Sequence, residues 1–170
     1  MRRLARVMPA LVVLGLVLVA AQPWSLPAGY RFLLPLLPVL AVAHFALLRP
    51  ALMPAGVAFM GGLLLDVLTT GPLGYWAMIY VLARMLAALL SPPTLPGAAA
   101  RVGLAALMLA VVAISAWLVA LPLGGTLADW RPLATAALGA LAVYPLLLLL
   151  ARPLDTMLAL GETIRLERGS

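Results

Sequence analysis

The chain is built from long apolar runs that alternate with short polar stretches, many of which carry proline or glycine. Arginine and the acidic residues lie almost entirely outside the runs. A helix needs about 20 apolar residues to cross the hydrocarbon core of a bilayer, and most of the runs approach that length. The pattern therefore predicts six membrane-spanning helices, followed by a charged tail over residues 152–170. The predicted spans are 5–21, 32–48, 52–68, 75–90, 102–121 and 132–150.

The composition leads to the same class of protein. Hydrophobic residues make up 66% of the 170 positions and charged residues 9%, and the mean hydropathy is +1.18. A soluble domain carries about 25% charged residues, so a water-soluble core of this length could not enclose so much apolar surface. We expect an all-α, polytopic membrane protein in which residues 1–170 form one integral membrane domain. The first run also has the form of a cleavable signal peptide, but the even division of the later runs favours its retention as a span.

The distribution of arginine predicts how the bundle is oriented. With six spans both termini lie on one side of the membrane. That side holds eight arginines, namely Arg2, Arg3, Arg6, Arg49, Arg101, Arg152, Arg165 and Arg168. The other side holds Arg31 and Arg131. Because cytoplasmic loops are enriched in basic residues, both termini are expected in the cytoplasm, with the turn at Gly71-Pro72 facing outward.

Several functional classes receive no support from the residues. The chain has no cysteine, so it has neither a disulfide framework nor a thiolate metal site. The net charge of +6 comes from arginines that flank apolar runs, which does not suggest a nucleic-acid surface. Phosphate-binding, zinc-protease and catalytic-triad motifs are absent from the sequence. We therefore predict no catalytic residue, no cofactor and no metal ligand, and we do not expect an enzyme.

Two ionisable residues, Asp66 and Arg84, stand inside apolar runs. Each is disfavoured in a membrane helix by roughly 2.5 to 3.5 kcal/mol, so such residues usually have a specific role. On neighbouring antiparallel helices the two side chains lean towards each other, because side chains point to the N-terminus of their own helix. One hypothesis is an intramembrane ion pair, direct or through water. The alternative is that Asp66 accepts hydrogen bonds from exposed amides of the following turn, where Gly71 and Pro72 end the helix.

Other features allow two interpretations each. Trp76, Tyr80 and Arg84 fall at four-residue steps, and this strip either faces a partner or cavity or simply packs. His44 is a lone histidine, for which burial with a hydrogen bond is a simpler explanation than a proton relay. A stripe of small residues lies in the fifth run and would allow close approach of another helix. Its members are Gly103, Ala106, Ala110 and Ala113.

The stretch Gly62-Leu63-Leu64-Leu65-Asp66, followed by Gly71-Pro72-Leu73-Gly74 at the start of a helix, resembles the rod shape-determining protein MreD family. The chain length, the short loops and the six predicted spans are similar to that family as well. The resemblance implies a structural or partner-binding role for the motif residues, which are Asp66, Gly71, Pro72, Leu73, Gly74 and Arg84.

The resemblance also implies a function. A member of this family is a non-enzymatic scaffold in the bacterial inner membrane that organises side-wall peptidoglycan synthesis and rod shape. Its expected partners are MreC, a single-span membrane protein, together with the actin-like MreB, the polymerase RodA and a class B penicillin-binding protein. The family is similar in fold to the substrate-binding membrane subunits of energy-coupling-factor transporters. A subunit that binds a small molecule such as a vitamin is therefore the alternative function.

Overall fold

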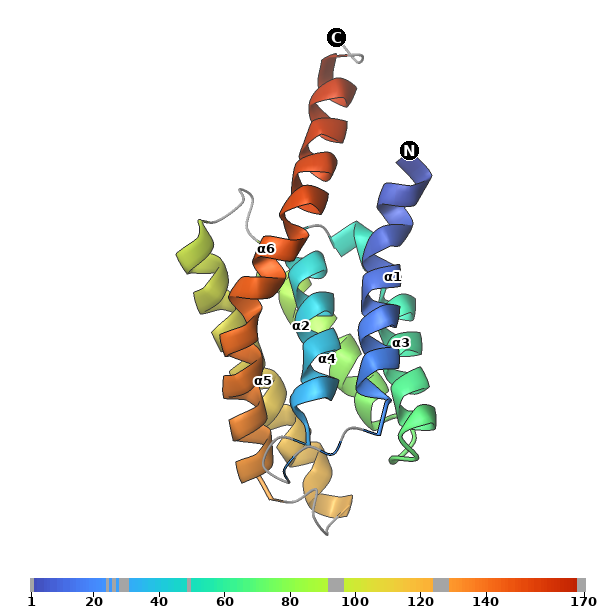
Figure 1. Cartoon of the computed structure of the whole chain (residues 1–170), viewed down its shortest axis with the longest axis vertical. Coiled ribbons are helices and arrows are strands. Elements are labelled where there is room, and N and C mark those ends of the chain that lie inside the picture. Colours follow the sequence, from blue (N-terminus) through green and yellow to red (C-terminus); the bar gives the residue numbers. More distant parts are fainter. Residues whose placement is uncertain are drawn as a thin grey trace.

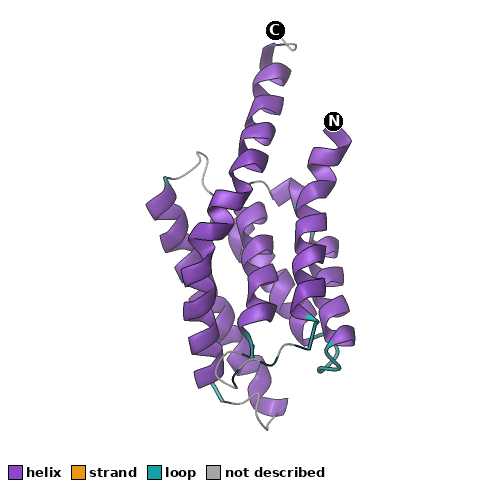
Figure 2. Cartoon of the chain, in the orientation of Figure 1, coloured by secondary structure: helices purple, strands orange, loops and turns teal. Residues whose placement is uncertain are grey.

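The structure is a computed structural model that describes residues 2–23, 25, 27, 31–48, 50–91, 97–123 and 129–167. All regular structure within these ranges is helical (Figure 2). The α-helices are α1 Arg2–Ala20, α2 Leu33–Leu48, α3 Ala55–Leu68, α4 Tyr75–Leu89, α5 Ala98–Ala120 and α6 Arg131–Glu167. Two 3-10 helices, η2 Pro50–Leu52 and η3 Leu121–Leu123, precede α3 and follow α5. The all-α part of the predicted fold class is confirmed.

Helix α2 lies at the centre of the bundle, where it packs against α1, α4 and α6 (Figure 1). Twelve of its 16 residues are buried, as expected for a helix that is apolar on all sides. Pro38 stands inside α2 and lacks the amide that a helix normally donates. The carbonyl four residues earlier, that of Leu34, therefore lacks its usual helical donor. The next carbonyl along, that of Pro35, accepts a hydrogen bond of 3.2 Å from the hydroxyl of Tyr80 in α4.

Four helices, α1, α4, α5 and α6, contact α2, while α3 packs on α4 and α1, and the outer sides of these five helices carry apolar side chains. Representative side chains that are at least two-fifths exposed are Leu11, Met60, Met78, Leu107 and Leu138, one from each of α1, α3, α4, α5 and α6. Exposure of such a large apolar surface to water is unfavourable, whereas contact with lipid tails is not. The apolar outside therefore agrees with the composition.

The lengths of the helices divide them into two groups. By length and composition α5, over Ala99–Ala120, and α6, over Arg131–Leu149, are able to cross a membrane. The apolar parts of the other four described helices are shorter, namely Val7–Ala20, Leu33–Leu48, Ala55–Leu68 and Tyr75–Leu89. The 14 residues of α3, for example, extend about 21 Å, against about 30 Å for a hydrocarbon core. The count of six spans therefore stays a prediction.

Helix α6 is longer than the sequence predicts. The sequence predicts that the sixth span ends at residue 150, before a separate tail. Helix α6 instead has 37 residues and continues without a break from Arg131 to Glu167. Its second half projects beyond the bundle, at the same end as the N-terminus (Figure 1). An interior proline such as Pro153 ordinarily kinks or ends a helix, which is why the sequence predicts a break near residue 150 that the structure does not have. The side chains of α6 are described as far as Leu149.

Candidate functional site

The carboxylate of Asp66, near the end of α3, caps the start of α4. Its Oδ2 accepts hydrogen bonds from the backbone amides of Gly74 at 2.9 Å and Ala77 at 3.3 Å. Its Oδ1 accepts a hydrogen bond from the amide of Trp76 at 2.9 Å. The side chain is fully buried. A negative charge at the positive end of a helix dipole, bonded to three amides, is a strong N-cap delivered from another helix.

This cap leaves no amide of the first turn of α4 without an acceptor. The four amides at a helix start have no partner within the helix itself. Here Asp66 serves Gly74, Trp76 and Ala77, while the amide of Tyr75 donates to the carbonyl of Pro72 at 3.1 Å. In a site that excludes water each of these groups would otherwise carry a desolvation cost. The sequence Asp66 to Gly74 therefore builds a self-contained helical hairpin.

The backbone of Asp66 also takes part in ending α3. Its carbonyl accepts a hydrogen bond from the amide of Gly71 at 3.1 Å, and the carbonyl of Val67 accepts one from Thr70 at 3.4 Å. These two bonds form a Schellman motif, which needs a left-handed residue at the position now occupied by Thr70. Thr70 indeed has a φ of 52°. The predicted end of the third span at residue 68 agrees with the end of α3 at Leu68. The sequence pointed to Gly71 and Pro72 as the residues that end the helix, whereas the left-handed residue is Thr70, one position earlier, and Gly71 donates the bond of the motif that Asp66 accepts.

Gly74 provides the second left-handed position of the turn. It has a φ of 90° and is the N-cap residue of α4. A residue with a Cβ is strained there even though open space surrounds the position. Between the two left-handed residues the side chain of Leu73 is 75% exposed, so it lies at the tip of the hairpin rather than in its packing.

Gly62, one helical turn before Asp66, allows α3 and α4 to approach. A Cβ at this position would lie 2.5 Å from the carbonyl oxygen of Trp76 and 2.6 Å from the backbone nitrogen of Ala77. These are the residues whose amides Asp66 binds. Residues four apart lie on one face of a helix, so Gly62 supplies the close contact and Asp66 the hydrogen bonds on the same face. This pair forms the core of the hairpin.

Arg84 holds the opposite end of the hairpin. Its Nε donates to the carbonyl of Met53 at 3.0 Å, and its Nη2 donates to the carbonyl of Pro50 at 3.4 Å. Both acceptors belong to the connection before α3. The hypothesis of a direct ion pair with Asp66 is therefore wrong, and the alternative, in which Asp66 binds the amides of the turn, is confirmed. Because α3 is short, Arg84 comes level with the start of α3 and binds there.

The remaining candidates resolve as packing residues. Trp76 and Tyr80 are buried, with ring centroids 6.4 Å apart, so the packing interpretation of that strip is confirmed. His44 is fully buried, and its Nδ1 lies 3.2 Å from the hydroxyl of Tyr144, which joins α2 to α6. Ser91 donates to the carbonyl of Leu47 at 2.8 Å and so caps the end of α2.

The predicted docking stripe lies on the outer side of α5. Gly103 and Ala110 are exposed, and Ala106 and Ala113 are partly buried. A Cβ at Gly103 would touch nothing within 4 Å. The helices of this chain therefore do not use most of the stripe, and its role as a docking surface stays a prediction.

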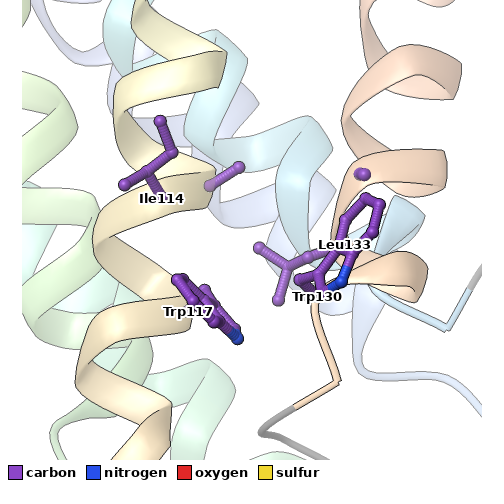
Figure 3. A pocket seen from close by; sticks show the side chains of 6 residues that line it. Ile114, Trp117, Trp130 and Leu133 are labelled. Carbon is purple, nitrogen blue, oxygen red and sulfur yellow. The ribbon is translucent and has the colours of Figure 1, made fainter.

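At one end the stripe runs into a pocket between α5 and α6. The pocket has a volume of about 360 Å³ and is lined by Ala113, Ile114, Trp117, Trp130, Leu133 and Ala134. Figure 3 shows Trp117 on α5 and Trp130 just before α6, on either side of it. Apart from the two indole nitrogens, the lining side chains carry no polar atom.

Gly62, the left-handed Thr70 and the tryptophan pocket were not identified as site features from the sequence. Of these features, the sequence offered a signal for Gly62, because it stands four positions before Asp66, an acid inside an apolar run. Among the described residues no group of three or more His, Cys, Asp or Glu side chains is placed to hold a metal ion. Comparison of the chain with models of known families, with curated proteins and with solved structures found no match.

Proposed function

We propose that this chain is a non-enzymatic scaffold of the MreD type in the bacterial inner membrane, where it organises side-wall peptidoglycan synthesis. The observation that carries the proposal concerns the residues of the resemblance. Asp66, Gly71, Pro72 and Gly74 all build the α3–α4 hairpin through their backbone or carboxylate groups. This motif fixes the geometry of a hairpin and has its carboxylate bonded to three backbone amides. Such a motif suits a scaffold, which works by presenting a surface of fixed shape to its partners.

The surface of the bundle supports a location in lipid. Apolar side chains point outward from five helices, and the residues that are charged lie mostly at the two ends of the bundle. In this proposal all six helices cross the membrane, with both termini in the cytoplasm and the hairpin turn outside. The four shorter helices are accommodated by their connections, such as η2, and by local thinning of the bilayer.

Scaffolding requires faces that the chain leaves uncovered. The outer side of α5, with Gly103 and Ala110 exposed, is the face on which a transmembrane helix of an MreC-like partner would pack, because small residues permit close backbone contact. MreB, RodA and a class B penicillin-binding protein would belong to the same assembly. The alternative function, binding of a vitamin, gains little from the pocket, whose lining is almost wholly apolar.

The test compares two glycine variants in a rod-shaped bacterium whose own MreD is depleted. The intact chain and the Gly61→Ala variant are expected to restore rod shape and to co-purify with the single-span partner. Gly62→Ala is expected to do neither, because its Cβ would enter the backbone of α4, whereas that of Gly61 meets only side chains at 3.6 Å or more. Failure of the intact chain to restore rod shape, although it is inserted in the membrane, would refute the proposal.

A further inference from the structure

The pocket between α5 and α6 has the size and lining of a ligand site. Its volume of about 360 Å³ lies within the range of small-molecule pockets, and its walls are hydrocarbon apart from two indole rings. A polar ligand would lose its hydration there without receiving hydrogen bonds in return. The occupant that fits such walls is a hydrocarbon chain.

The two tryptophans indicate the depth at which the polar part of such a ligand would lie. Trp117 lies in the last turn of α5, and Trp130 directly precedes α6, so both stand at the end of the helices rather than at mid-length. Indole rings of membrane proteins settle at the level of lipid headgroups, with an apolar body and a polar N–H. The position of both rings beside the pocket (Figure 3) therefore places its mouth at headgroup depth.

A basic residue next in sequence to the pocket lining suggests the kind of headgroup. Arg131 follows Trp130 directly, is exposed, and opens α6. The one acid beside it, Asp129, directs its Oδ1 to the backbone amide of Arg131 at 3.0 Å, so that carboxylate is engaged in capping α6. The carboxylate of Asp129 is thus held against the start of α6, while the exposed guanidinium of Arg131 has N–H groups that can bond two oxygens of a phosphate.

We infer that this pocket binds one anionic phospholipid. One hydrocarbon chain of the lipid lies between α5 and α6, the indoles of Trp117 and Trp130 flank it at the level of the ester groups, and Arg131 binds the phosphate. The inference rests on the membrane location in the proposed function, but not on the scaffold role.

The experiment uses the full chain reconstituted in vesicles of equal parts phosphatidylglycerol and phosphatidylethanolamine, then released into detergent and weighed by native mass spectrometry. We expect one retained phospholipid, with phosphatidylglycerol favoured. Ala134→Phe places a ring inside the pocket and should lower retention about tenfold. The matched control is Ala142→Phe, which makes the same substitution on an exposed site of α6 outside the pocket and should leave retention unchanged.

A second arm needs no change within the bundle. Arg131→Gln should abolish the preference for phosphatidylglycerol, whereas Arg131→Lys should keep most of it. Equal retention in the two phenylalanine variants, or an unchanged preference in Arg131→Gln, would overturn the inference. Cross-linking of position 134 to a helix of a partner or of a second copy would overturn it too. Rod shape restored by a chain that retains no lipid would refute this site alone and leave the scaffold proposal standing.

Discussion

Replacing Asp66 with alanine should destabilise the protein more than any other single loss of a polar group described above. The substitution removes the acceptor for three amides at the start of α4, on Gly74, Trp76 and Ala77. The bonds from Trp76 and Ala77 are buried, and the bond from Gly74 is partly buried. Water can therefore replace the carboxylate at one amide more easily than at the other two.

The size of the effect follows from those two buried donors. A buried donor left without a partner costs about 1 to 3 kcal/mol, so two of them cost about 2 to 6 kcal/mol. Removal of a buried charge returns part of this, because alanine carries no desolvation penalty. We expect a net loss of about 3 to 4 kcal/mol in the free energy of unfolding. Asp66→Asn keeps one carbonyl oxygen at the site and should lose about half as much.

Asp129 provides a matched control within the same chain. It is also an aspartate at the start of a helix, but it is exposed and its carboxylate bonds one amide, that of Arg131, at 3.0 Å. Asp129→Ala should cost about 0.5 to 1 kcal/mol, as exposed N-caps do. The measurement is unfolding by denaturant in detergent micelles, followed by helical circular dichroism and by tryptophan fluorescence. If Asp66→Ala proved no more costly than Asp129→Ala, the proposed role of the buried cap would be wrong.

Three further predictions concern the same hairpin. Gly62→Ala should cost about 1 to 3 kcal/mol because backbone must move, whereas Gly61→Ala should be neutral or stabilising; unfolding in micelles compares them. Thr70→Gly should stabilise by about 0.5 to 1 kcal/mol, because it relieves a left-handed threonine with φ of 52°, and a lower midpoint would contradict this. Asp66→Asn and Arg84→Gln should add to within about 0.5 kcal/mol in a double-mutant cycle, because they bind opposite ends of the hairpin, and strong coupling would revive the ion pair.

The sequence was enough to predict which helix lies inside the bundle. A helix that is apolar on every side must be surrounded, and α2 is. The choice between the two partners of Asp66 was not accessible in the same way. The ion pair with Arg84 and the binding of turn amides were both compatible with the charges of Asp66 and Arg84 and with their positions in the sequence. They differed only in the level along α3 at which Arg84 lies. That level depends on how many residues α3 contains and where η2 begins, which the apolar pattern leaves uncertain by several residues.

By itself the sequence determined that the protein is helical, where the apolar runs lie, and that one acid belongs next to a turn. These follow from local physics, because hydrophobic spacing, proline and glycine act within a few residues. Only the tertiary structure decided that Gly62 must be a glycine, that Thr70 rather than Gly71 is left-handed, and that Trp117 and Trp130 share a pocket. The need for glycine at position 62 and the pocket between Trp117 and Trp130 depend on distances between segments that meet only when the helices pack. The left-handed Thr70 depends on the residue at which α3 ends, which the apolar pattern does not define closely enough.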